Sequence, residues 1–255
     1  NEGLKTIGDN AFKGTGITDV VIPDTVTSVG NNAFADCTEL ETVSIPITLE
    51  ITEGMFEDCD SLAEIILTRG SDGKGHNYTD ETYKNTPWYN RDLNNLEITI
   101  SEGVEHIGDY TFYGCDDLTE AVLPSTTTSI GDNAFAGTGI TEITIPEGVT
   151  EIGDGAFANT GLSSVTIPEG VESIGDGAFA GCGSLTEIVI PGTVESIGDN
   201  AFAGCENVTS LTIPADLEIT AGMFEDLKNL EEIVITAGKT GEMPDYGEPN
   251  KNAPW

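Results

Sequence analysis

Apolar residues recur along this chain with a period of about 22 or 23 residues. A short alternation, Leu-x-x-Ile-x-Ile, is followed by Pro, then by a Val and an Ile, and then by an Ala-Phe pair. The frame is plainest where residues 171–190 read VESIGDGAFAGCGSLTEIVI and residues 194–213 read VESIGDNAFAGCENVTSLTI. The strand-like segment occurs ten times, ending near Ile22, Ile45, Leu67, Ile100, Leu123, Ile145, Ile167, Ile190, Ile213 and Ile235. A fixed period of this length indicates a solenoid in which each repeat forms one coil.

The pattern within a coil predicts its local structure. The alternation at Ile188 and Ile190 predicts a short strand with one buried face, and Pro191 ends it because proline has no backbone donor. Gly198 then permits a tight bend, and Asp199 is placed to cap a turn that carries the Ala-Phe pair inward. We therefore predict an α/β solenoid: a right-handed stack of about ten coils, with one parallel β-sheet and short helical or 3-10 turns opposite it. Stacking is required because one coil alone buries too little apolar surface to offset its ordering entropy.

The full frame is I-P-x-x-V-x-S-I-G-x-x-A-F-x-G-C-x-x-L-T-x-I, and it covers nearly the whole chain. It resembles the BspA-like leucine-rich repeats of bacterial cell-surface proteins. The resemblance implies a leucine-rich-repeat fold in a protein that is displayed on the cell surface or secreted. Some members of that family are adhesins for host matrix proteins or for other bacteria. The family has no binding-residue motif, so the resemblance assigns no site.

Two stretches break the period. Residues 49–58 (LEITEGMFED) return as residues 217–226 (LEITAGMFED), and the stretch after each copy ends in Asn-x-Pro-Trp, at Trp88 and Trp255. This pattern indicates a duplicated block of about 168 residues, and we expect the repeats to continue beyond both ends of the chain. The predicted organisation is leucine-rich repeats over 1–67, an aromatic-containing interruption between repeat stacks over 68–92, leucine-rich repeats over 93–236, and the truncated start of a second interruption over 237–255.

The interruption holds aromatic residues that the repeat does not require: Tyr78, Tyr83, Trp88 and Tyr89. One interpretation is a loop with its own small hydrophobic cluster, folded over the side of the solenoid or joining two stacks. The other is a loop that contacts a ligand, because Tyr and Trp are favoured anchors at interfaces.

The outward positions of the predicted strands form a second candidate ligand-binding surface, represented by Glu142, Thr144, Glu187 and Val189. Stacked repeats present extended surfaces of this kind. The strip is rich in Thr, Ser and Glu and has no aromatic anchor, so a merely solvated face is the alternative. The sequence thus favours a non-enzymatic extracellular binding or adhesion module for a protein or cell-surface ligand. The alternative function is a structural spacer or stalk that projects another domain from the cell surface.

Reactive side chains follow the repeat rather than forming a catalytic site. Five cysteines stand three residues after a repeat Phe, in a slot that elsewhere takes Thr or Leu, so we expect small packing sites with free thiols rather than disulfides. The Asp after each Ile-Gly step is interpreted as a cap, in preference to a Ca²⁺ ladder. His76 and His106 are the only histidines and lie apart from any reactive Cys. We therefore predict no enzyme, no metal site and no cofactor.

The charge narrows the class of partner. There are 45 Asp and Glu residues against 9 Lys and Arg, for a formal net charge of −36. A surface this acidic repels nucleic-acid phosphates and anionic lipid. It attracts cations and basic patches on a partner. No apolar run is long enough to span a bilayer, so we expect neither nucleic-acid binding nor membrane insertion.

Overall fold

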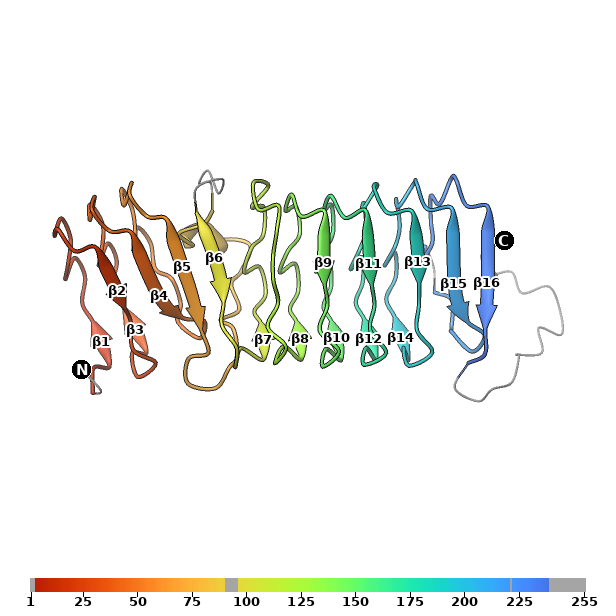
Figure 1. The fold of residues 1–255 in the computed structure, drawn as a ribbon, viewed down its shortest axis with the longest axis horizontal. Coiled ribbons are helices and arrows are strands. Elements are labelled where there is room, and N and C mark those ends of the chain that lie inside the picture. Colours follow the sequence, from red (N-terminus) through yellow and green to blue (C-terminus); the bar gives the residue numbers. More distant parts are fainter. Residues whose placement is uncertain (1–2, 90–95, 221, 239–255) are drawn as a thin grey trace.

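The computed structural model describes residues 3–89, 96–220 and 222–238. These residues form an elongated stack of coils, with β1 (Thr6–Ile7) at one end and β16 (Glu232–Thr236) at the other (Figure 1). All strand pairs of the described part are parallel. The predicted stack of about ten coils is confirmed, whereas its right-handed winding stays a prediction. No helix of the described part is long and apolar enough to cross a membrane.

The strands lie in two rows on different sides of the coils, where the sequence predicted one sheet. The first row contains nine of the ten predicted segments: β2 (Asp19–Val21), β4 (Thr42–Pro46), β5 (Glu64–Thr68), β6 (Glu97–Ile100), β9 (Glu142–Thr144), β11 (Ser164–Thr166), β13 (Glu187–Val189), β15 (Ser210–Pro214) and β16. The second row contains β1, β3 (Ser28–Val29), β7 (His106–Ile107), β8 (Ser129–Ile130), β10 (Glu151–Ile152), β12 (Ser173–Ile174) and β14 (Ser196–Ile197). A second row forms because stacked coils of nearly equal length bring equivalent extended segments side by side, as Ser173 is with Ser196.

The first row is divided into three sheets. Their orders are β2-β4-β5-β6, β9-β11 and β13-β15-β16. The row is therefore broken twice: between β6 and β9, where the coil containing residues 119–123 runs without a strand (Figure 1), and between β11 and β13, which are not paired.

The third side of each coil is a ladder of turns, not the helical or 3-10 turns that we predicted. The N–H of Phe157 donates to the carbonyl of Ala178 in the next coil (2.7 Å), whereas the N–H of Ala158 donates back to Gly155 (2.9 Å). The turns use two left-handed residues per coil, here Gly155 (φ 61°) and Asn159 (φ 56°). Asn and Gly occupy such positions because other side chains are strained there. Alternate N–H groups are thus free to pair the coils along this side too.

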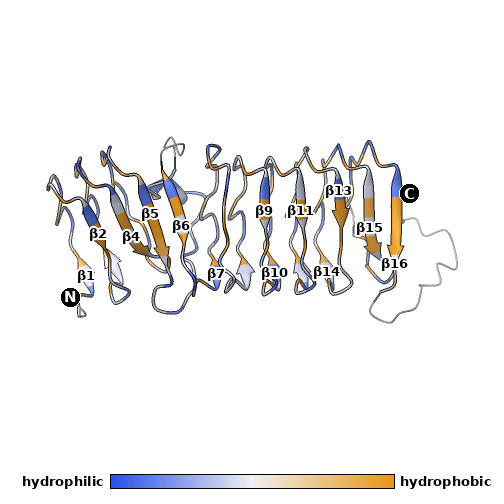
Figure 2. Cartoon of the chain, in the orientation of Figure 1, coloured by the Kyte–Doolittle hydropathy of each residue, from blue (hydrophilic) through white to orange (hydrophobic). Residues whose placement is uncertain are grey.

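The repeat Phe side chains lie in the interior, as predicted, except in the first coil and the last, where Phe12 is exposed and Phe224 is partly buried. Phe157, Phe179 and Phe202 are fully buried, and their ring centroids are 5.3 and 5.2 Å apart with nearly parallel planes. Figure 2 shows apolar and polar segments alternating around the coils and along the strands. The apolar positions of neighbouring coils therefore share a single core.

The Ile-Gly-Asp step holds successive coils together. Oδ1 of Asp154 accepts a hydrogen bond from the backbone N–H of Asp176 (2.7 Å), and Oδ1 of Asp176 accepts one from Asp199 (2.8 Å). The predicted role of these residues as caps within their own coil is wrong for Asp9, Asp109, Asp132, Asp154 and Asp176, whose carboxylates accept a hydrogen bond from the equivalent residue one coil later. In the coils that follow another coil, the glycine before the Asp is needed for close approach: a Cβ on Gly175 would lie 2.6 Å from the carbonyl carbon of Gly153.

The described part of the interruption continues the stack as one longer coil. Glu64 of β5 pairs with Glu97 of β6, 33 positions later, instead of 22 or 23. Trp88 follows the short 3-10 helix η1 (Tyr83–Asn85) and takes the place of the repeat Phe, with its ring 5.5 Å from that of Phe112. Its Nε1 donates to the carbonyl of Thr111 (2.7 Å). Residues 90–92 of the predicted interruption and 239–255 of its second copy lie outside the described residues.

Candidate binding surface

The predicted strand-face residues point outward in the structure. In β9, Glu142 and Thr144 are exposed on either side of the buried Ile143. In β13, Glu187 and Val189 have the same arrangement, and the Val189 side chain is 43% exposed. The two pairs share the face but belong to different sheets.

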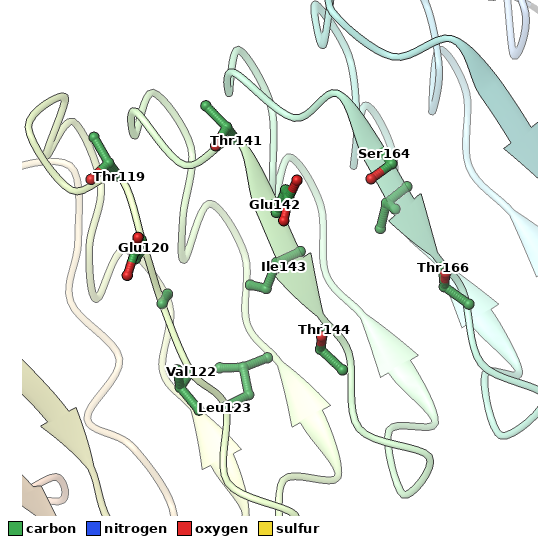
Figure 3. Close-up of a pocket in the computed structure, with 12 residues that line it drawn as sticks. Thr119, Glu120, Val122, Leu123, Thr141, Glu142, Ile143, Thr144, Ser164 and Thr166 are labelled. Atoms are coloured by element: carbon green, nitrogen blue, oxygen red, sulfur yellow. The ribbon is translucent and has the colours of Figure 1, made fainter.

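A cavity of about 530 Å³ brings Glu142 and Thr144 together with the unpaired segment 119–123. Its walls come from three successive coils, and Figure 3 shows side chains of each along the groove. The lining residues are 119–123, 141–144 and 164–166. Glu187 and Val189 do not line it, so the two predicted pairs lie in different parts of the face.

A second cavity of about 350 Å³ lies on the other side of the same segment. It is lined by residues 96–98 and 117–120 and by Val122. Thr119, Glu120 and Val122 line both cavities, and the Val122 side chain is 82% exposed. Segment 119–123 is therefore a ridge between two hollows, in a place where every other coil has a strand.

The loss of the strand has a cause in the sequence. The inward positions of this coil are Leu118, Ala121 and Leu123, where a regular coil has Leu185, Ile188 and Ile190. An Ile side chain that is fully buried contributes about 1.5–3 kcal/mol, and Ala contributes much less. Ala is also depleted in strands, where β-branched residues are favoured. The segment thus has little to hold it against the core, and the hollow beside it remains.

The electrostatic character of both hollows is acidic. Glu97, Asp117, Glu120 and Glu142 line them, and neither lining contains a Lys, Arg or His. Three of these carboxylates, those of Glu97, Glu120 and Glu142, belong to three successive coils of the face. A cationic group that enters the groove therefore meets carboxylates from several coils at once.

The interruption divides its four predicted aromatic residues between core and surface. Trp88 and Tyr78 are 2% and 6% exposed, and burial raises the pKa of the Tyr78 hydroxyl. Their burial agrees with the interpretation of this stretch as a small hydrophobic cluster folded on the solenoid. Tyr83 and Tyr89 are half-buried at the surface, with ring centroids 5.1 Å apart.

Two further tyrosines that we did not select complete this surface cluster. The rings of Tyr110 and Tyr113 lie 6.2 and 4.8 Å from that of Tyr83. Tyr110 has a left-handed φ of 55°, in a slot where the other coils have Asn or Gly. That departure from the repeat was the available sequence signal. The pKa of Tyr83 is raised to about 12, chiefly by burial, with hydrogen bonding to Tyr89 adding to it. These contacts anchor the longer coil to the next one.

The remaining candidate chemistry of the described residues is structural. Nδ1 of His106 lies 2.7 Å from Oγ of Ser129, and burial lowers the pKa of both His106 and His76. The described part contains no group of three or more His, Cys, Asp or Glu that would hold a metal ion.

The cysteines are free and buried, as expected. Sγ of Cys182 donates to the carbonyl of Phe157 (3.1 Å), and Sγ of Cys205 donates to that of Phe179 (3.3 Å). Where Thr fills the slot, its hydroxyl donates within its own coil, as Thr160 does to Phe157 (2.9 Å). A small donor at this slot therefore suits the repeat, whether it is a thiol or a hydroxyl.

These features define a leucine-rich-repeat solenoid of the bacterial surface-protein type. The chain belongs to the family of BspA type leucine rich repeat regions, whose model, described with six copies, matches residues 1–79, 81–160 and 150–243. The match indicates no enzyme family.

Several solved structures are similar to this chain. A leucine rich cell surface protein from Faecalibacterium prausnitzii A2-165 is 21% identical, with a TM-score of 0.45 over 93% of this chain and 84% of that one. A leucine-rich repeat protein from Bacteroides ovatus ATCC 8483 is 26% identical, with a TM-score of 0.44 over 86% of this chain and 63% of that one. The pneumococcal vaccine antigen PcpA is 20% identical, with a TM-score of 0.49 over 93% of this chain and 61% of that one. The chain therefore spans less than two thirds of the last two. The curated proteins contain no significant match.

Proposed function

We propose that this chain is a non-enzymatic extracellular binding or adhesion module, which presents its strand face to a protein or cell-surface ligand. The observation that carries the proposal is the hollowed, acidic part of that face around segment 119–123. Concave surfaces with a few convergent polar groups are where proteins bind their ligands. Membership of a family of surface-protein repeats supports display on the cell surface or secretion.

The test is a binding screen of the purified chain against immobilised extracellular matrix proteins and against intact bacteria. Glu142→Arg places a large cation in the groove, and Glu172→Arg makes the same change at an exposed position outside it. We expect at least one ligand to bind, and Glu142→Arg to weaken that binding while Glu172→Arg leaves it unchanged. Equal binding by both variants would mean that the ligand binds outside the groove around segment 119–123.

A structural spacer is the second candidate function, and the regular part of the face around β13 and β15 favours it. The outward residues of β13 and β15 are Glu187, Val189, Ser210 and Thr212, which include no aromatic anchor. Hydrogen bonds join successive coils on all three sides over most of the stack, as expected of a stiff rod. A chain that binds no ligand in the screen, while flanking regions of the longer protein do, would support this role instead.

A further inference from the structure

Four tyrosine rings meet at the surface on the turn side of the coils. Tyr110 and Tyr113 belong to the turn ladder, in which the N–H of Tyr110 donates to the carbonyl of Asp132 (2.8 Å). Tyr83 and Tyr89 come from the preceding, longer coil, and the ring of Tyr83 lies within 4.8–6.2 Å of the other three. All four residues are half-buried, so part of each remains open to solvent. We call these four residues the tyrosine cluster.

Tyr110 occupies a backbone conformation that is unfavourable for a bulky side chain. Its φ is 55°, and the other eight left-handed residues of the described part that are not glycine are all Asn or Asp. Left-handed backbone is strained for a residue as large as Tyr. Strained residues of this kind gather at binding and active sites, where the surrounding structure holds them in place.

Tyr113 is a second departure from the repeat in the same coil. The next four coils have Ala at this position, at residues 136, 158, 180 and 203. Both substitutions bring a ring to the same cluster, since the rings of Tyr110 and Tyr113 lie 5.3 Å apart. One coil therefore departs from the repeat twice to build a single aromatic surface.

The longer coil is joined to the next one without these rings. The N–H of Tyr78 donates to the carbonyl of Asp109 (3.0 Å), and Nε1 of the buried Trp88 donates to the carbonyl of Thr111 (2.7 Å). The anchoring contacts of the tyrosine cluster add to a connection that is already made. Stacking of the coils thus gives no complete account of two extra tyrosines at the surface.

The chemistry around the tyrosine cluster favours a planar cation. Burial raises the pKa of the Tyr110 hydroxyl, and the nearby carboxylates of Asp80 and Asp132 raise it further. Nζ of Lys84 lies 5.7 Å from the ring centroid of Tyr83, within the range over which a ring attracts a cation. A guanidinium group suits rings beside carboxylates, because its plane stacks on an aromatic face and its N–H groups pair with carboxylate oxygens.

We propose that the tyrosine cluster binds arginine side chains on the surface of a partner protein. The guanidinium group stacks on a tyrosine ring, and its N–H groups donate to Asp80 or Asp132. The charge of these carboxylates favours a cation over a neutral sugar, which also stacks on aromatic rings. The site goes beyond the proposed function, because it lies on a different side of the coils from the groove around segment 119–123.

The experiment uses the peptide Gly-Arg-Gly-Arg-Gly, blocked at both ends, and measures its affinity by calorimetry. Salt at about 0.15 M screens attraction by the acidic surface beyond about 8 Å. A second peptide has citrulline in place of Arg, which keeps the planar shape and removes the charge. A third has Lys, which keeps the charge and removes the plane. We expect the Arg peptide to bind at least about tenfold more tightly than either.

Protein variants locate the site. Tyr110→Asn restores the residue that the next coil has at this position, Asn133, so the fold should tolerate it. This variant should bind the Arg peptide at least about tenfold more weakly, and Tyr113→Ala should also weaken binding. Asp80→Asn should weaken it too. Glu172→Gln removes the same charge from an exposed position outside the cluster and should leave binding unchanged.

Each contrary result overturns the proposal. Equal affinity for the Lys peptide would show charge attraction without stacking, and equal affinity for the citrulline peptide would show that charge plays no part. A folded Tyr110→Asn protein that keeps its full affinity for the Arg peptide places the contact elsewhere. Binding of a neutral oligosaccharide such as maltopentaose, in place of the Arg peptide, would assign the cluster to a glycan. The proposed function is tested separately by Glu142→Arg on the strand face and stands if this inference alone fails.

Discussion

The close approach of neighbouring coils at the Ile-Gly-Asp step can be tested by adding a single methyl group. A Cβ on Gly175 would lie 2.5 Å from the backbone nitrogen of Asp154 and 2.6 Å from the carbonyl carbon of Gly153. Both obstacles are backbone atoms, so no side-chain rotation relieves the contact. The coils must separate, which weakens the hydrogen bonds from Gly175 N–H to Ile152 O (2.8 Å) and from Asp176 N–H to Asp154 Oδ1 (2.7 Å).

The expected cost follows from these contacts. Overpacking costs about 1–3 kcal/mol and each lost hydrogen bond about 1 kcal/mol, so Gly175→Ala should lower the free energy of unfolding by about 3–5 kcal/mol. Two substitutions in the same coil are controls. Gly177 has a left-handed φ of 60°, and an added Cβ would make only an ordinary contact with Ala180 (3.7 Å), so Gly177→Ala should cost about 1–2 kcal/mol of backbone strain. Gly183 has neither restraint, and Gly183→Ala should change stability by less than about 0.5 kcal/mol.

Urea unfolding followed by circular dichroism measures all three variants. The order of midpoints should be Gly183→Ala, then Gly177→Ala, then Gly175→Ala, with the last well separated. If Gly175→Ala proves no more harmful than Gly177→Ala, the coils are not in close contact at this step. The glycine would then serve only the bend that the sequence first suggested.

Three further predictions concern the interior and the coil-to-coil contacts. Phe179→Ala should lower the free energy of unfolding by about 3–5 kcal/mol because the Phe179 ring is fully buried between two others. Phe12→Ala should lower it far less because the Phe12 ring is 41% exposed, and thermal unfolding of the two variants tests this difference. Burial raises the pKa of the Cys115 and Cys205 thiols to about 12, against 9.0 for a free thiol, so folding favours the protonated form. The stabilisation that these two thiols provide should be complete below pH 9 and should decline as the pH rises toward 12. Urea unfolding midpoints measured across that range test this, and midpoints that do not change with pH would refute the prediction. Asp154→Ala removes the acceptor for the Asp176 N–H and should lower the free energy of unfolding by about 1–3 kcal/mol in urea unfolding. Asp154→Asn keeps a side-chain oxygen as acceptor and should lower it less.

The repeat and its core could be predicted from the sequence because both are periodic. The ten apolar alternations and the recurring Phe require only that equivalent positions stack. The second row of strands could not be predicted, because each of its strands is a Ser-Ile step or its equivalent, two residues long, and has no apolar-polar alternation to detect. The hydrogen-bond partner of Asp154 could not be predicted from the sequence either. Its carboxylate binds a backbone group 22 residues away, and the local pattern of a cap looks the same.

The candidate binding surface was predicted in part. Glu142 and Thr144 were selected because they face outward, and they do, but nothing in their own coil distinguishes them from Glu187 and Val189. The distinction comes from the preceding coil, where Ala121 replaces a core Ile. We counted that segment among the strands because Leu118 and Leu123 fit the pattern. The replacement of one core Ile by Ala121 in an otherwise regular repeat was the sequence signal of the hollow.

A solenoid with three bonded sides can lose one of them locally and remain folded. At the coil of residues 104–124 the turn ladder and the second strand row continue, and the rings of Phe112 and Phe135 stay 5.1 Å apart. The free energy of stacking is therefore retained while backbone groups on the strand side are left unpaired. In a globular sheet the same opening would expose the core on both flanks. Because each coil depends mainly on its neighbours, the loss of pairing on one side stays local, as it does again between β11 and β13.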